Sequence, residues 1–290
     1  MSPDSSMAVI TKEKGMATAD NESLTSQVNH VRHVLAVASG KGGVGKSLVS
    51  AMAAVELARR GLKVGIMDAD ITGPSIPRLF GMTARPESSM VGIIPPETAT
   101  DIKTISMNLF LDDSGQPVIW RGPLLTSAIK QFWTDVAWGD LDVLIVDLPP
   151  GTADVPLTAF QSLPVDGILM VTTPQELASM IVEKAAGLAK QMRKPILGIV
   201  ENMATATCPH CGEAFELFGP SHAQELADHI GAPILARLPI DSEVTRQADT
   251  GHVEDVQMPS FATVTEVLAE YVATTSTVTA APAKPATPQG

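Results

Sequence analysis

The sequence has little cysteine, no excess of positive charge and no long apolar run. Only two cysteines occur among 290 residues, which is too few for a disulfide framework and typical of proteins kept in a reducing compartment. The 20 lysine and arginine residues are outnumbered by 32 aspartate and glutamate residues, which gives a net charge of −12. This balance disfavours general nucleic-acid binding, because neutralising phosphates requires positive charge. We therefore expect a cytoplasmic protein that does not bind nucleic acid.

Neither end of the chain resembles a targeting or membrane segment. No apolar run approaches the ~20 residues that cross a bilayer, and residues 1–30 lack the apolar block of a signal peptide. Residues 274–290 are rich in Ala, Thr and Pro and hold one lysine, so they cannot form a basic amphipathic anchor. We expect no stable membrane association, and disordered tails at 1–30 and 274–290.

Between these tails, short apolar runs alternate with helix-compatible stretches. The alternation predicts one α/β domain over 31–273, with an open, mostly parallel sheet and helices on both faces. The runs are typical of strands buried on both faces; they cover 34–38, 63–67, 142–146, 167–171 and 196–200. The predicted helices follow the first run as far as Arg60 and then cover 124–136, 177–191, 222–230 and 261–273.

A glycine-rich loop follows the first predicted strand and opens a predicted helix. It has the spacing of a phosphate-binding loop, in which glycines let several backbone N–H groups point at one anion. Lys46 would reach the β and γ phosphates of ATP, and the Ser47 hydroxyl would bind Mg²⁺. The alternative, a glycine-rich turn with a chance lysine, requires the spacing and both flanks to be coincidental. The loop consists of Gly40, Lys41, Gly42, Gly43, Val44, Gly45, Lys46 and Ser47.

Three aspartates follow strand ends where this fold would need them. Asp68 and Asp70 come just after the second predicted strand, and Asp147 ends a strongly apolar one. Strand carboxyl ends line the ligand crevice of an open α/β sheet, so we expect all three carboxylates to face the nucleotide phosphates and the Mg²⁺ ion. Each aspartate alone would more commonly be a helix cap or turn residue.

The two cysteines, Cys208 and Cys211, form a C-x-x-C motif followed by Gly212. Such a pair can hold one metal centre, but a zinc site needs four ligands and no second C-x-x-C exists. A thioredoxin-like pair would sit at a helix start, whereas a loop-like stretch precedes this one. Two chains on a twofold axis would supply four thiolates, which suits a [4Fe-4S] cluster or a zinc ion. We favour iron–sulfur and predict half of a bridging site.

The chain resembles the Mrp/ApbC-type iron–sulfur cluster carriers, a branch of the deviant Walker A ATPases related to the ParA and MinD proteins. The chain departs from the family pattern at three positions. It has Thr72 where the family more often has an aromatic residue, Ala153 where the family has a glycine and Leu124 where the family has a methionine. The resemblance rests on seven stretches: Gly40 to Ser47, DADITGPSIPRLFG at 68–81, WRGPL at 120–124, DLPPGTAD at 147–154, VENM at 200–203, CPHCG at 208–212 and LPID at 238–241.

The resemblance also implies roles for individual residues. Lys41 would act in trans on the partner's phosphates, Asp70 would position the attacking water, and Asp147 would be the Walker B carboxylate. Gly151 would lie in the switch loop that senses the γ-phosphate. The residues around the base would be Asn202, which contacts the adenine or is an ordinary turn residue, and Pro239 and Asp241, which close over it.

The expected function is an ATP-binding and slowly hydrolysing homodimer that carries a labile [4Fe-4S] cluster on Cys208 and Cys211. A cluster scaffold would be the donor, and apo iron–sulfur proteins would be the recipients. Hydrolysis would depend on Lys41, Lys46, Asp70 and Asp147. Two other functions stay open: a ParA/MinD-like positioning ATPase, and a nucleotide-gated scaffold with zinc bridged between subunits.

Overall fold

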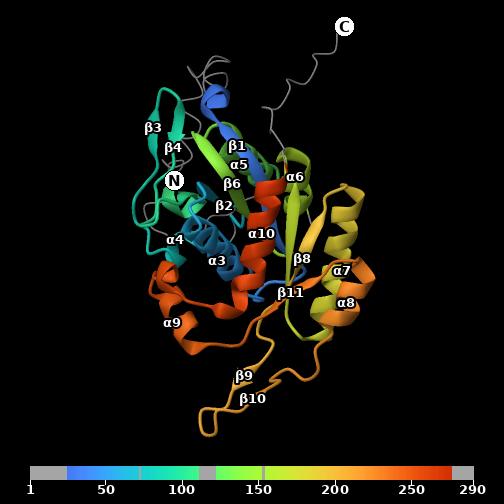
Figure 1. Cartoon of the computed structure of the whole chain (residues 1–290). Helices are drawn as coiled ribbons and strands as arrows, with labels where there is room; N and C mark the ends of the chain where they lie inside the picture. The colour runs from blue at the N-terminus through green and yellow to red at the C-terminus, as the bar shows by residue number, and fades with distance from the viewer. Residues whose placement is uncertain (1–24, 72, 111–121, 152–153, 276–290) are drawn as a thin grey trace, which may run out of the picture.

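The computed structural model describes residues 25–71, 73–110, 122–151 and 154–275. At its centre is a seven-stranded parallel sheet with the order β11-β8-β7-β1-β6-β2-β5 (Figure 1). Its strands are β1 (His30–Ser39), β2 (Val64–Asp68), β5 (Lys103–Ile105), β6 (Asp140–Asp147), β7 (Gly167–Thr172), β8 (Ile196–Glu201) and β11 (Ile234–Arg237). Two antiparallel pairs lie outside this sheet: β3 (Glu87–Ser89) with β4 (Gly92–Ile94), and β9 (Ala206–Thr207) with β10 (Ala214–Phe215).

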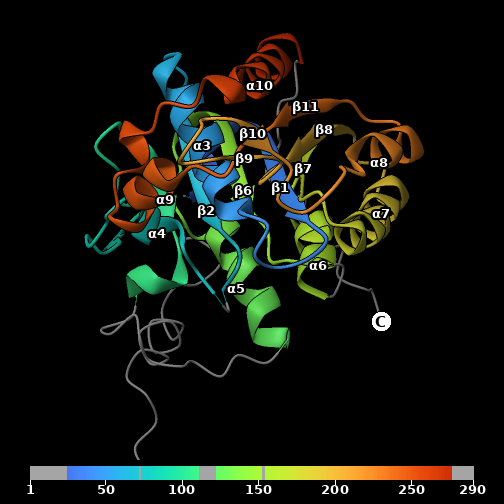
Figure 2. The ribbon, with the colours of Figure 1, turned by 90° about the horizontal axis from the view of Figure 1, so that it is seen from below.

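Helices cover both faces of the sheet, as Figure 2 shows from below. None of the helices in the described ranges is long and apolar enough to span a bilayer. The α-helices are α3 (Lys46–Arg59), α4 (Ile76–Leu79), α5 (Gly122–Thr134), α6 (Asp154–Ser162), α7 (Glu176–Gln191), α8 (Ala223–Ile230), α9 (Ser242–Asp249) and α10 (Ala262–Thr274).

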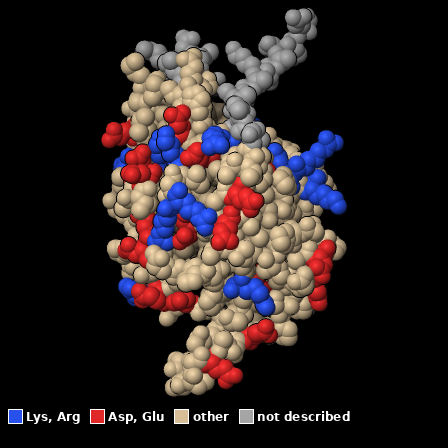
Figure 3. Space-filling view, in the orientation of Figure 1, with Lys and Arg blue, Asp and Glu red and all other residues tan. Residues whose placement is uncertain are grey.

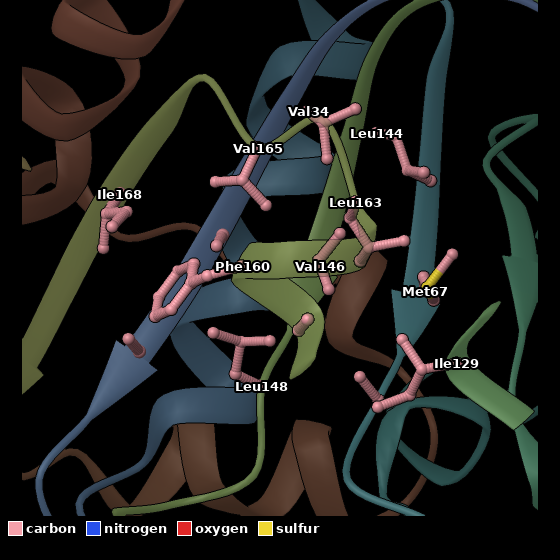
Figure 4. Packing of buried hydrophobic residues seen from close by; sticks show 14 of the residues in the cluster. Val34, Met67, Ile129, Leu144, Val146, Leu148, Phe160, Leu163, Val165 and Ile168 are labelled. Carbon is pink, nitrogen blue, oxygen red and sulfur yellow. The ribbon is translucent and has the colours of Figure 1, made fainter. Parts of the chain in front are cut away.

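The central strands bury alternate residues in two separate cores. In β1, Val34 and Ala36 belong to one core, and Leu35 and Val37 belong to the other, because successive side chains of a strand point to opposite faces. The first core also contains residues of α5 to α8, and Figure 4 shows Ile129 and Phe160 packed there against the strands. The second core contains residues of α3 and α10. A sheet covered on both faces explains why its strands read as unbroken apolar runs.

The strand order reverses at β1, which lies between β6 and β7. The chain leaves β1 for β2, beyond β6 on one side, and leaves β6 for β7 on the other side. Ligands of open α/β sheets bind outside the carboxyl ends of the strands at such a switch point. The loop after β1 is therefore in the position where this fold binds a ligand.

The predicted fold class is confirmed, and every predicted strand and helix is present with small shifts of its ends. The prediction missed β5 and β11, which are only three and four residues long, and it missed α6 and α9. The folded part also starts earlier than expected, since the Thr25 hydroxyl donates to the Val91 carbonyl at 2.7 Å and Asn29 Nδ2 donates to the Val136 carbonyl at 2.8 Å. Of the tails predicted for 1–30 and 274–290, residues 1–24 and 276–290 lie outside the described residues, as do residues 120–121, Thr72 and Ala153.

Candidate functional site

The loop from Gly40 to Ser47 connects β1 to α3, as its sequence predicts. Gly43 and Gly45 have φ values of 77° and 82°, a conformation that glycine adopts without steric cost. A Cβ atom at Gly45 would lie 2.1 Å from Asn202 Nδ2, so a side chain there would displace the Asn202 amide group. Helix α3 has no side-chain cap and no acidic residue in its first turn. Its first N–H groups are thus left for an anion.

Lys46 and Ser47, the last two residues of this loop, both contact Asp147 at the end of β6. Lys46 Nζ lies 2.7 Å from Asp147 Oδ1, and the Ser47 hydroxyl donates to Asp147 Oδ2 at 2.7 Å. The Ser50 hydroxyl, which sequence reasoning missed, donates to Asp147 Oδ1 at 2.6 Å. The Asp147 carboxylate is fully buried, so these donors offset the cost of removing its charge from water. The Ser47 hydroxyl and Asp147 carboxylate are oxygen ligands of the kind that Mg²⁺ prefers, so the residues fit a magnesium ion.

Asp68 lies beside Asp147, because the two residues are register partners in the β2–β6 pair. Its side chain is fully buried, and burial, with the charge of Asp147 as a second cause, raises the pKa of Asp68 to about 8. Its Oδ2 atom accepts hydrogen bonds from the Ser75 amide at 3.0 Å and the Ser106 hydroxyl at 3.2 Å. These contacts hold the loop after β2, and the expected role of Asp68 facing the phosphates stays a prediction.

Asp70 lies in that loop, and its side chain is half-buried. Its amide donates to Asp68 Oδ1 at 3.2 Å, so Asp68 fixes the backbone that carries the Asp70 carboxylate. On the other side of the crevice, the Gly151 amide donates to the Ser39 carbonyl at 2.9 Å, and Gly151 has a φ of 93°. The two segments assigned to water positioning and γ-phosphate sensing are thus attached to β1 and β2. Their catalytic roles stay predictions.

Lys41 contacts its own chain in this structure. Its Nζ atom donates to Gln175 Oε1, at the start of α7, and its carbonyl accepts a hydrogen bond from the Ser39 hydroxyl at 3.0 Å. A role in trans requires the ammonium group to leave Gln175 when a second chain approaches. The half-buried position of Lys41 is compatible with that exchange.

The residues predicted to surround the base have other contacts here. Asn202 Nδ2 donates to the Val44 carbonyl inside the phosphate-binding loop at 2.9 Å. The Asp241 carboxylate caps α9 by accepting from the amides of Glu243 at 2.8 Å and Val244 at 3.2 Å. Pro239 lies between β11 and Asp241 and is half-buried. Adenine binding by these three residues remains a prediction.

Cys208 and Cys211 lie in the turn between β9 and β10. These two strands form a hairpin that projects from the side of the sheet where the strands have their carboxyl ends and where the phosphate-binding loop lies (Figures 1 and 2). The residues before Cys208, expected to be a loop, form β9. The Cys208 amide donates to the Glu213 carbonyl, and the Gly212 amide to the Cys208 carbonyl, both at 2.9 Å. Cys208 is half-buried and Cys211 is exposed.

The cysteine turn favours a thiolate. The backbone amide of Cys211 is the main cause of a lowered pKa of the Cys208 thiol, with further hydrogen bonds from the His210 amide and the Cys211 thiol. Within the described ranges, no group of three or more His, Cys, Asp or Glu side chains is placed to hold a metal ion. Among the described residues, one chain therefore offers two thiols and no third ligand beside them.

This fold and its loop define a P-loop nucleotide-binding protein, and the projecting cysteine pair adds a second candidate site to it. The family model described as "ParA: NUBPL iron-transfer P-loop NTPase" matches residues 30–274. The chain belongs to this family of iron-transfer P-loop NTPases.

Curated relatives and solved structures agree with this membership. The chain is 40% identical over 252 residues to the iron-sulfur cluster carrier protein of Clostridium perfringens, covering 84% of this chain and 88% of that protein. It is 44% identical over 233 residues to the iron-sulfur cluster carrier protein of Pseudomonas fragi, covering 80% of this chain and 81% of the relative.

Among solved structures, the nucleotide-binding protein of Archaeoglobus fulgidus in complex with ADP superimposes with a TM-score of 0.72. It is 43% identical, and the match covers 83% of this chain and 95% of that one. The cell-division ATPase MinD of Pyrococcus furiosus has a TM-score of 0.63 at 20% identity, covering 82% of this chain and 98% of that one. The second likeness shows a shared fold.

Proposed function

We propose that this protein is an ATP-hydrolysing carrier that holds a [4Fe-4S] cluster between two copies of the chain and transfers it to apo-proteins in the cytoplasm. The observation that carries the proposal is the pair of accessible thiols at the carboxyl ends of the strands, where the phosphate-binding loop also lies. A cluster scaffold would load the thiols, and apo iron–sulfur proteins would receive the cluster. Both cysteines are free thiols, as the reducing cytoplasm requires.

The nucleotide part of the proposal rests on the contacts of Lys46. Its ammonium group, now 2.7 Å from Asp147, exchanges this carboxylate for the β and γ phosphates of ATP. Ser47 and Asp147 would hold Mg²⁺, which supplies positive charge to the phosphates when bound. Asp70 orients the water for in-line attack on the γ-phosphorus, from which ADP departs. Lys41 of a second chain adds positive charge where the departing ADP develops negative charge.

The cluster part rests on the surface around the hairpin. Four of the six large apolar side chains that the described residues expose lie on or beside it: Phe215, Leu217, Phe218 and Ile240, with exposed fractions between 37% and 51%. Figure 3 shows acidic and uncharged atoms on the projecting end and no blue ones on the face drawn. Exposed apolar side chains mark association surfaces, and a twofold pairing here would bring four thiolates together.

The decisive experiment is anaerobic reconstitution of the full chain with iron and sulfide. We expect about two iron and two sulfide per chain, since four cysteines from two chains hold one cluster, together with a broad visible absorption band and a dimer by light scattering. The Cys208→Ser/Cys211→Ser double variant is the control and should bind no iron. A colourless protein with zinc in place of iron would overturn the cluster assignment.

Transfer and hydrolysis need separate measurements. The loaded dimer should activate an apo enzyme that requires a [4Fe-4S] cluster, and phosphate release from ATP should require Mg²⁺. ATP-dependent co-sedimentation with liposomes or DNA, without iron binding, would instead support a positioning ATPase.

A further inference from the structure

Glu201, which the proposed mechanism does not use, is a fully buried carboxylate between the two candidate sites. It is the last residue of β8, next to Asn202 in sequence. A buried carboxylate is costly unless it is paired and hydrogen-bonded. Its partners therefore indicate what the position requires.

Both oxygens of Glu201 are bound to segments that flank the cysteine hairpin. Arg237 Nε, at the end of β11, donates to Oε2 at 2.6 Å, and the Ser221 hydroxyl donates to Oε1. Ser221 closes the cysteine segment just before α8, where its oxygen also accepts from the Ala223 amide at 3.1 Å. Arg237 in turn lies 3.9 Å from Glu216, which follows β10. The Glu201 carboxylate thus holds Ser221, at the end of the hairpin segment, directly. It contacts the residue after the second hairpin strand through Arg237.

The neighbouring residue connects the same strand end to the nucleotide loop. The Asn202 side chain donates to the Val44 carbonyl at 2.9 Å, and its amide donates to Thr172 on β7 at 2.9 Å. Glu201 ends the strand and Asn202 follows it in a turn, so the same strand end contacts the phosphate-binding loop through Asn202 and the base of the hairpin through Glu201. Movement of Val44 when phosphates enter the loop would therefore be passed to the hairpin.

We infer that Glu201 is a positioning residue that connects nucleotide occupancy to the orientation of Cys208 and Cys211. The inference rests on the proposed function for its biological meaning, since a carrier must change its hold on the cargo with nucleotide state. The connection itself is a property of the metal-free protein. It makes the two sites interdependent, and such a dependence acts equally in both directions.

The test measures the reactivity of the two thiols rather than cluster transfer. Full-length, reduced, metal-free protein is alkylated with iodoacetamide, alone and with Mg²⁺ and ADP or a non-hydrolysable ATP analogue, and each cysteine is followed by mass spectrometry. In the wild type we expect nucleotide to change the alkylation rate constant by at least about five-fold, the lower end of typical coupling. In Glu201→Gln and in Ser221→Ala this change should shrink to less than about two-fold, with ADP affinity kept because neither side chain contacts the loop.

A matched control is available in Glu254. Its carboxylate likewise holds a loop, accepting from the Thr98 hydroxyl at 2.6 Å and the Thr100 amide at 3.0 Å, and Glu254→Gln should behave like the wild type. A wild type whose thiols do not respond to nucleotide would overturn the inference, and so would a full response in Ser221→Ala, which removes no buried charge. Failure of the cluster assignment is measured independently, by the iron count of the reconstituted wild type.

Discussion

The phosphate-binding loop and the cysteine hairpin both lie at the carboxyl ends of the strands, but the first packs into the domain and the second projects from it. The loop is packed between strands and α3, and its lysine is paired with a fully buried aspartate. The hairpin has two strands of two residues each, and apolar side chains on and beside it are exposed. Apart from Lys41 of a second chain, the residues proposed to bind the phosphates thus all come from one chain, whereas one chain supplies only half of the proposed four-thiolate site. On the proposed function, nucleotide binding can therefore precede assembly, while cluster binding requires it.

The largest expected effect is the loss of ATP binding when the lysine of the phosphate-binding loop is removed. Lys46→Ala should weaken ATP binding by at least about 100-fold, because charge-assisted hydrogen bonds to the phosphates are lost. Calorimetric titration with ATP measures this change. Asp147 keeps the Ser47 and Ser50 hydroxyls, so a thermal melt should show that the variant folds. Unchanged ATP affinity in a folded variant would refute the assignment of the loop.

Cys211→Ser should have the opposite effect, with iron binding lost and ATP binding kept. This substitution should reduce the iron bound after reconstitution to background, because it reduces the four thiolates of the dimer to two. ATP affinity should stay within about two-fold of the wild type, since the Cys211 side chain lies outside the phosphate-binding loop and the contacts of Glu201 and Asn202 remain in place. Iron analysis and ATP titration of the same sample measure both. A matched drop in ATP affinity would mean that the two regions are not separable.

A smaller effect is expected at the contact between Asn202 and the loop. Asn202→Ala removes the hydrogen bond to the Val44 carbonyl and should weaken ADP binding by roughly five-fold, since one such bond contributes about 1 kcal/mol. Fluorescence titration with labelled ADP measures the loss. Asp241→Ala is the informative comparison, because it should lower the stability of α9, whose cap it removes, by about 1 kcal/mol. An unaltered ADP affinity in Asn202→Ala would show that the contact does not shape the loop.

The last effect concerns the pH dependence of stability. The pKa of Asp68 is about 8 in the folded protein, against an ordinary value of 3.8, so between these values the folded state holds a proton that the unfolded chain has released. The contribution of Asp68 to the free energy of unfolding must therefore fall as pH rises through this window. Asp68→Asn should flatten this slope in urea denaturation series at pH 5 to pH 8. Equal slopes in both proteins would contradict the assignment.

Sequence patterns predicted the sheet well because a parallel sheet covered on both faces needs continuous apolar strands. They missed β5 and β11, since three- and four-residue strands at the sheet edges carry too little pattern. The phosphate-binding loop was predictable from local glycine and lysine spacing. Ser50, Glu201 and Arg237 were not, because their partners are distant in the chain and only the folded topology brings the pairs together. The contacts of Asp68 were missed for the same reason, since adjacency to Asp147 depends on strand register.

The hydrogen bond from Ser221 to Glu201 also makes the cysteine segment a separable attachment. The chain leaves the sheet at the end of β8 and returns to the same carboxylate before α8 begins, and in between β9 and β10 pair with each other rather than with the central sheet. A shorter turn in place of these two strands would leave a nucleotide-binding domain without the cysteine pair. The same scaffold could therefore acquire or lose its cargo in evolution through one exchangeable loop, without a change to its core.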